Sequence, residues 1–203
     1  IFPCKSRLVV GGHSSVMDWS ITYSSVVQRE SVRICLLLAA LNELDVQCGD
    51  IQNAYLTAPC REKIWCWAGA EFGDEQGTPM KVVRALYGLK SSGAAFRAFL
   101  AEHLNTIGFK PTMADPDVWL RPAIKPDGEE YYEYILVYVD DLLSVSHKSK
   151  EVMKEIQEAF RFKNDKVEPP TTYLGAELEM KQTLEGKCWT MTSTKYVKAA
   201  IEN

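Results

Sequence analysis

The chain has 203 residues, of which 46% are hydrophobic and 25% charged, and these proportions are those of an ordinary soluble globular protein. The length suits one well-buried domain, with room for a lobe or subdomain. A formal net charge of −4 argues against a dedicated nucleic-acid-binding protein, which usually carries a basic excess, and no apolar run reaches the ~20 residues of a membrane-spanning helix.

The N-terminal part of the chain predicts a short strand, a buried helix and a second strand. Basic side chains alternate with others over residues 5–10, and two glycines then close the pattern. Residues 29–42 are dense in Leu and Ala, which is typical of a largely buried helix. Alternating apolar residues over 44–50 predict a strand that ends at Asp50. Because residues 51–56 suit one or two helical turns, Asp50 is either a chemically active residue or only their N-cap.

The middle of the chain predicts two short strands and one long helix. Residues 63–67 and 80–86 are strand candidates, separated by a polar loop that contains glycine. A serine-capped helix then covers about residues 92–105, with apolar side chains at helical spacing.

Residues 131–146 carry the clearest pattern in the chain. Two runs of β-branched, aromatic and aliphatic residues meet at Asp140 and Asp141, as in a β-hairpin. The adjacent carboxylates repel each other, and a bound divalent cation would offset that repulsion. The alternative is that aspartate is simply a good turn former.

The C-terminal part predicts an amphipathic helix over 149–160, a hairpin over 172–191 and the beginning of a helix over 193–203. The whole pattern indicates an α+β fold with a mostly antiparallel sheet and helices packed on one face. Six cysteines without paired spacing indicate buried free thiols in a reducing compartment.

Asp50 and the Asp140–Asp141 pair would form one site if their strands are neighbours in one sheet. Asp50, Asp140 and Asp141 would then converge at one edge. Magnesium prefers oxygen ligands, and two such ions ~3.5–4 Å apart clamp the attacking and leaving oxygens of a phosphoryl transfer.

Collinear blocks of sequence resemble the reverse transcriptase domain of Ty1/copia-type retrotransposons over nearly the whole chain. The most specific are Asp50-Ile51-Gln52-Asn53-Ala54-Tyr55-Leu56, Leu86-Tyr87-Gly88-Leu89-Lys90, Tyr138-Val139-Asp140-Asp141 and Tyr173-Leu174-Gly175. The resemblance implies the palm and fingers of a right-hand polymerase, with a thumb that is missing or only begun. The fingers would cover approximately residues 1–43 and 58–90, the palm 44–57 and 91–186, and the start of a thumb or connector 187–203.

The resemblance assigns catalysis and metal binding to Asp50, Asp140 and Asp141, with the backbone carbonyl of Ile51 as a further ligand. The implied cofactor is a pair of Mg²⁺ ions, for which Mn²⁺ is a substitute.

The resemblance also implies a group of nucleotide-binding residues: Lys5, Arg7, Tyr55, Tyr87, Gly88, Lys90 and Phe96. The Tyr55 ring would exclude a ribose 2′-hydroxyl, and Gly88 would let the backbone approach the template base closely. The alternatives are core packing for the aromatic rings and a solvated strand face for the two N-terminal cations. Lys163 or Lys166 would donate a proton to leaving pyrophosphate, or would belong to an ordinary basic loop.

Two blocks depart from the family pattern without touching the acids. Gly11-Gly12-His13 replaces the common Ala-Arg-Gly-Phe, which puts the contacts of that fingers loop in doubt. Residues 92–96 stand where many relatives have Ala-Pro-Arg followed by Trp.

The implied function is that of an RNA-directed DNA polymerase within a longer retrotransposon polyprotein. Its partners would be an RNA or DNA template with primer, dNTPs, and the RNase H and integrase parts of the polyprotein. Its location would be intracellular, in a cytoplasmic virus-like particle with a nuclear phase. The alternatives are a truncated remnant that binds nucleic acid or a partner without polymerising, and an unrelated α+β protein, which would leave the ordered blocks unexplained.

Overall fold

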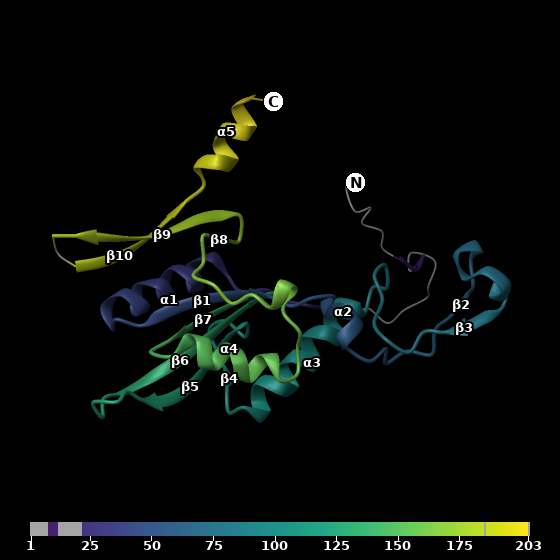
Figure 1. Ribbon diagram of the computed structural model, residues 1–203, viewed down its shortest axis with the longest axis horizontal. Helices are drawn as coiled ribbons and strands as arrows, with labels where there is room; N and C mark the ends of the chain where they lie inside the picture. Colours follow the sequence, from purple (N-terminus) through teal and green to yellow (C-terminus); the bar gives the residue numbers. More distant parts are fainter. Residues whose placement is uncertain (1–7, 12–21, 185, 203) are drawn as a thin grey trace. The chain divides into compact units, whose positions relative to one another are not determined.

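The computed structural model describes residues 8–11, 22–184 and 186–202 (Figure 1). The chain divides into two compact units. The hairpin unit contains residues 1–24 and 53–102, and the sheet unit contains residues 25–52 and 103–203. Lys5 and Arg7 lie outside the described residues, so their predicted contacts stay predictions.

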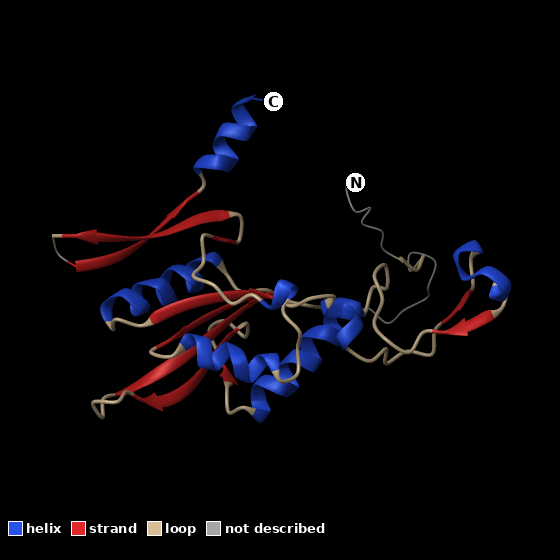
Figure 2. Cartoon of the chain, viewed as in Figure 1, coloured by secondary structure: helices blue, strands red, loops and turns tan. Residues whose placement is uncertain are grey.

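The sheet unit is built on a five-stranded antiparallel sheet with the order β1-β7-β6-β5-β4. Strands are drawn in red in Figure 2. Its strands are β1 (Asp45–Asp50), β4 (Lys110–Pro111), β5 (Val118–Ile124), β6 (Glu130–Tyr138) and β7 (Asp141–Ser146). β6 and β7 form the predicted hairpin, and β1 pairs antiparallel with β7. The predicted antiparallel sheet and the strand that ends at Asp50 are confirmed.

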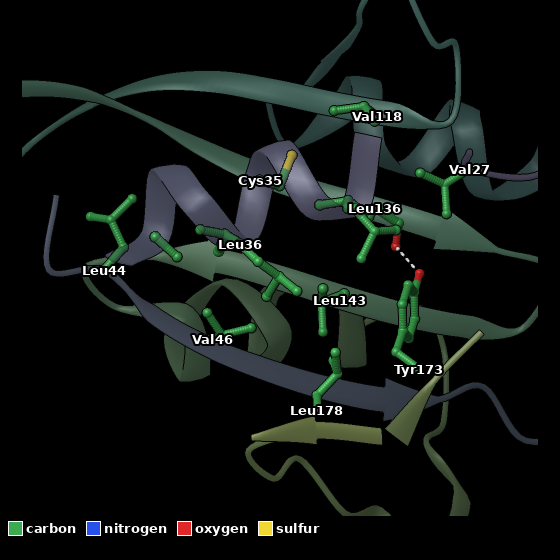
Figure 3. Close-up of a cluster of buried hydrophobic side chains, with 13 residues drawn as sticks. Val27, Cys35, Leu36, Leu44, Val46, Val118, Leu136, Leu143, Tyr173 and Leu178 are labelled. Carbon is green, nitrogen blue, oxygen red and sulfur yellow. Dashed lines mark hydrogen bonds between the residues drawn. The ribbon is translucent and has the colours of Figure 1, made fainter. Parts of the chain in front are cut away.

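Helices cover both faces of this sheet, so the prediction that they pack on one face was wrong. α1 (Arg29–Leu41) contributes to a buried apolar cluster with the central strands (Figure 3), and Cys48 packs against that cluster. A side chain at neighbouring Gly49 would instead meet Met153 of α4 (Ser149–Gln157), because successive strand residues point to opposite faces. The physical reason is that β7 is buried on both faces, and each face requires an apolar cover.

A smaller antiparallel sheet with the order β10-β9-β8 completes the sheet unit. Its strands and the adjoining helices are β8 (Thr172–Tyr173), β9 (Ala176–Thr183), β10 (Gly186–Thr192), the 3₁₀ turn η4 (Lys163–Asp165) and α5 (Thr194–Glu202). Tyr173 and Leu178 join the same buried cluster as α1, so the small sheet is anchored through apolar contacts.

The hairpin unit contains α2 (Ala54–Thr57), β2 (Trp65–Trp67), η3 (Ala70–Glu75) and β3 (Pro79–Lys81), and α3 (Ser92–Thr106) begins in it. β2 and β3 are paired but shorter than predicted. β3 ends early because the chain changes partner: the Cys60 amide donates to the Val83 carbonyl, and the Ala85 amide donates to the Ala58 carbonyl.

The described cysteines are free thiols, as predicted, but only Cys35 is fully buried. Burial raises the pKa of Cys35 to about 12 and that of Cys48 to about 11, with smaller contributions from nearby carboxylates. Within the described ranges, no helix combines the length and the apolar character that a membrane span requires.

Candidate active site

The end of β1 and the tip of the β6–β7 hairpin are held together by backbone hydrogen bonds. Asp50 is the cross-strand partner of Asp141 at the last position of the β1–β7 ladder. One residue further on, the Ile51 amide donates to the Asp140 carbonyl at 2.8 Å. The convergence predicted for these acids therefore follows from the strand register, and Ile51, which is fully buried, lies at the junction.

The turn that presents the acids is strained. β6 ends at Tyr138 and β7 begins at Asp141, so Val139 and Asp140 form the turn between them. Val139 has a φ of 56°, in the left-handed region that a β-branched side chain rarely enters. Because such a conformation persists only when its surroundings impose it, the two ladders on either side fix the position of the acids.

The acids destabilise one another electrostatically. The pKa of Asp141 is raised to about 6, first by partial burial and then by the charges of Asp140 and Asp50, although the side chain keeps contact with water. Lys163 acts in the opposite direction and lowers it. The site therefore has an excess of negative charge, and a cation placed there would be stabilised.

Lys163 pairs directly with one of the acids. Its Nζ lies 2.8 Å from Oδ2 of Asp50, and this hydrogen bond and the charge of Asp50 raise the pKa of Lys163. The segment that carries Lys163 is held beside β1, because Phe162 forms a bridge with Ile51 and the Gln52 amide donates to the Arg161 carbonyl at 2.8 Å. Lys163 is thus positioned by the backbone.

The carboxylates fit a hard divalent ion by their chemistry and by their common edge of the sheet. Among the described residues, however, no three His, Cys, Asp or Glu side chains are already grouped as a metal site. Asp50 is instead engaged by Lys163. A metal ion at Asp50 would share that carboxylate with the ammonium group or displace it, so the predicted ligand set of Asp50, Asp140, Asp141 and Ile51 stays a prediction.

A cavity of about 580 Å³ opens beside the acids within the sheet unit. Asp50, Asp141 and Lys163 line one part of it, and Tyr173 and Glu177 line another. Its volume is that of a small-ligand site, and its lining carries charges of both signs, with Lys166, Glu168 and Glu177 in addition to the groups beside the acids.

Tyr173 lies beside the acids, and the sequence patterns did not predict a role for it. Its hydroxyl lies 3.2 Å from the Leu136 carbonyl (Figure 3) and 3.4 Å from the Asp141 carbonyl, and it donates to these acceptors. The side chain is buried, which raises its pKa well above the ordinary value for tyrosine and keeps the hydroxyl protonated. The sequence feature that could have identified Tyr173 is its place in the family block Tyr173-Leu174-Gly175. That block alone does not indicate a contact with the β6–β7 hairpin.

The aromatic residues predicted to bind nucleotide converge in the hairpin unit. The Tyr55 ring centroid lies 5.1 Å from that of Tyr87 and 6.3 Å from that of Phe96. Phe96 is buried, whereas Tyr55, Tyr87 and Lys90 are half-buried. The cluster is consistent both with a nucleotide platform and with the alternative of core packing.

Gly88 is required by the backbone of its own unit. Its φ is 91°, and a Cβ there would lie 2.1 Å from the Val10 carbonyl oxygen. The Val10 amide also donates to the Tyr87 carbonyl at 2.9 Å. At Gly88, glycine therefore permits the close approach of another backbone segment of the chain, and the role of Gly88 at the template base stays a prediction.

Comparison with known proteins gives a consistent result. Residues 3–203 match the family model described as "Reverse transcriptase (RNA-dependent DNA polymerase)". The "Retrovirus-related Pol polyprotein from transposon TNT 1-94" of Nicotiana tabacum is 27% identical over 98% of this chain and 15% of its own length. The corresponding polyproteins from transposons RE1 and RE2 of Arabidopsis thaliana are 31% and 29% identical over 68% of this chain, and over 9% and 10% of their own lengths. The chain thus spans at most 15% of each of these relatives.

Proposed function

The chain belongs to the reverse transcriptase (RNA-dependent DNA polymerase) family, and we propose that it is the catalytic part of a Ty1/copia-type retrotransposon polyprotein that copies RNA into DNA. The observation that carries this proposal is the register of β1 and β7, which sets Asp50 opposite Asp141 and next to the hairpin turn. Carboxylates held at one sheet edge suit the oxygen coordination of Mg²⁺ or Mn²⁺.

In the proposed mechanism, Asp50, Asp140 and Asp141 would hold two Mg²⁺ ions, with the Ile51 carbonyl as a further ligand. When bound, these ions would activate the primer 3′-hydroxyl and neutralise the triphosphate. The contribution of the chain is preorganisation: the ladder and the strained turn hold the carboxylates at one edge before substrate arrives.

The nucleotide-binding roles are part of the same proposal. The Tyr55 ring, packed near Tyr87 and Phe96, would exclude a ribose 2′-hydroxyl by its volume. Lys5 and Arg7 would contact the triphosphate as a point charge and as a bidentate donor. Gly88 and Lys90 would border the nascent base pair.

The proposed architecture is a right-hand polymerase. The fingers cover approximately residues 1–43 and 58–90, the palm 44–57 and 91–186, and a thumb or connector begins at about 187. The compact units divide the chain differently, since α1 belongs to the unit that contains the sheet. The antiparallel sheet that carries the acids supports the assignment of the palm.

The proposed partners are a template with its primer, dNTPs, and other parts of the polyprotein such as RNase H and integrase. The names of the relatives support a polyprotein setting. The proposed location is a cytoplasmic virus-like particle with a nuclear phase. The second candidate function is a non-polymerising remnant that binds nucleic acid or a partner, and the ion pair of Lys163 with Asp50 favours it, because an ammonium group occupies a carboxylate that a metal ion would use.

Primer extension on poly(rA)·oligo(dT) tests the proposal. We expect dTTP incorporation that requires Mg²⁺ or Mn²⁺ and is lost in Asp140→Asn, because one metal ligand loses its charge. The variant should melt no lower than the wild-type chain, since the change removes charge repulsion at the tip. Binding of primer–template without extension by the wild-type chain restored with its thumb would refute the polymerase and favour the remnant.

A further inference from the structure

The β2–β3 hairpin exposes two tryptophans on one face. Trp65 is 62% exposed and Trp67 is 73% exposed. Residues two apart on a strand point to the same side, and the intervening Cys66 is partly buried on the other side. Tryptophan is highly buried on average, so two neighbouring exposed rings make this face a candidate interaction surface.

Two lysines lie beside Trp65, at one end of this tryptophan pair. Lys81 is the cross-strand partner of Trp65. Lys63 lies two residues before Trp65, and the hydrogen bond from the Val82 amide to the Ile64 carbonyl extends the pairing in that direction. Both lysines are exposed, and in the part of the chain that the structure describes neither has a carboxylate partner. Their charges are available to an anionic ligand.

Acidic side chains and the two lysines lie at opposite ends of the β2–β3 hairpin. The η3 segment that joins the strands carries Glu71, Asp74 and Glu75, whereas Lys63 and Lys81 lie at the opposite end. An anionic chain lying across the tryptophans would therefore keep its phosphates near the lysines and away from the η3 turn.

The pairing of tryptophan with lysine distinguishes between two kinds of macromolecular partner. Protein–protein interfaces are enriched in tryptophan but depleted in lysine. Surfaces for single-stranded nucleic acid combine stacking rings with cations. Strand residues two apart are separated by about 6.6 Å, roughly twice the ~3.4 Å rise per nucleotide, which leaves room for a base between the rings.

We propose that Trp65 and Trp67, together with Lys63 and Lys81, form a stacking surface for single-stranded nucleic acid. The bases stack on the indole rings and the phosphates pair with the ammonium groups. Under the proposed function the strand is the unpaired template, and only that identification rests on the polymerase. Binding itself needs neither metal nor the acids of the sheet unit.

Fluorescence anisotropy with a labelled oligo(rU) tests the proposal on the full chain in EDTA. We expect Trp65→Ala/Trp67→Ala to weaken binding by about thirtyfold or more, because stacking contributes at least about fivefold on each of the two rings. Trp65→Phe/Trp67→Phe should retain most of the affinity, since phenylalanine also stacks. Tyr132→Ala, which removes another exposed aromatic ring from the sheet unit, is the matched control and should bind normally.

The salt dependence tests the lysines separately. Lys63→Gln/Lys81→Gln should reduce the slope of log K against log salt concentration by about 1.4, which is about 0.7 for each phosphate contact with a single strand. An unchanged slope would show that these lysines do not contact phosphate and would overturn their role.

Two further outcomes would overturn the whole proposal. One is unchanged affinity of the double alanine variant with a native circular dichroism spectrum. The other is self-association of the wild-type chain in sedimentation that the double alanine variant abolishes while RNA affinity is unaltered, which would identify a protein interface. The two proposals fail separately, because loss of oligonucleotide binding in the double alanine variant is measured in EDTA and does not depend on whether the wild-type chain extends a primer.

Discussion

Lys163 donates a hydrogen bond from Nζ to Oδ2 of Asp50 at 2.8 Å, so an ammonium group already neutralises the carboxylate that a metal ion would need. The two residues are far apart in sequence and meet because the segment before η4 pairs with Ile51 and Gln52. Mg²⁺ binding and this ion pair therefore compete for one oxygen atom.

Replacing Lys163 by Gln should raise the affinity for Mg²⁺ by up to about fivefold, because an exposed ion pair contributes no more than about 1 kcal/mol. Isothermal titration with Mg²⁺ measures the change. Lys166→Gln is the control, since it removes the same charge from the same segment and its ammonium lies 3.8 Å from Glu168. Equal affinity in the two variants would mean that the Asp50 pair does not oppose metal binding.

Replacing Asp141 by Asn should stabilise the chain at neutral pH in EDTA. The pKa of Asp141 is raised to about 6 in the folded state, so between its ordinary value and that value the folded chain binds more protons than the unfolded chain. Wild-type stability contributed by this group therefore falls as pH rises from about 4 through about 6. At pH 7 we expect a gain of about 1 kcal/mol in the variant, because water and salt screen a side chain this exposed.

Thermal melting between pH 3.5 and 8 measures this difference. The two curves should coincide below about pH 4, where the wild-type carboxyl is protonated in both states, and separate by about 2–4 °C above pH 6. Asp74→Asn, on the exposed η3 segment, controls for the general loss of one negative charge. A gap that widens toward low pH would contradict the assigned direction of the shift.

Local patterns in the sequence were sufficient to predict the acidic edge. The period-two alternation that ends at Asp50 and the two apolar runs around Asp140 each define a strand end, and the β1–β7 register joins them. The cover on both faces of the sheet was not predicted. Leu142 and Leu143 are adjacent apolar residues, and with Ser144 they lie in a strand that is buried on both faces.

The remaining contacts of the site depend on tertiary structure. Lys163 reaches Asp50 through a bridge between distant segments, and Tyr173 reaches the hairpin from a two-residue strand. No periodic pattern in the sequence predicts either contact, because each depends on how separate elements pack.

Gly49 should not tolerate a side chain. An added Cβ would lie 2.8 Å from the Phe162 ring and 3.0 Å from the terminal methyl group of Met153, and both of these side chains are fully buried. We expect Gly49→Ala to lower the free energy of unfolding by about 2 kcal/mol through overpacking. Chemical denaturation measures it, with Gly93→Ala as control, because a Cβ there meets Ser24 at an ordinary 3.5 Å. Equal stability of the two variants would refute the tight packing at Gly49.

Replacing Tyr173 by Phe should weaken the support of the β6–β7 hairpin beside Asp141 without leaving a cavity in the core. The ring stays and fills its buried place, but the hydroxyl no longer donates to the carbonyls of Leu136 and Asp141. Loss of this hydrogen bonding should cost about 1 kcal/mol of stability. Because the lost contact is to the backbone of Asp141, the concentration of Mg²⁺ that gives half of the maximal thermal shift should also rise, by about threefold if the carboxylates are held less tightly.

Tyr131→Phe separates this positioning role from a general loss of stability. The Tyr131 hydroxyl lies 3.1 Å from Oγ of Ser146 and 3.3 Å from Oε1 of Glu133, at the end of the same hairpin that is remote from the acids. Its loss should lower the melting temperature to a similar extent and leave the Mg²⁺ dependence unchanged. If both variants shift the Mg²⁺ dependence equally, Tyr173 stabilises the hairpin as a whole; if only Tyr173→Phe does, its hydroxyl holds the start of β7 where the metal ligands require it.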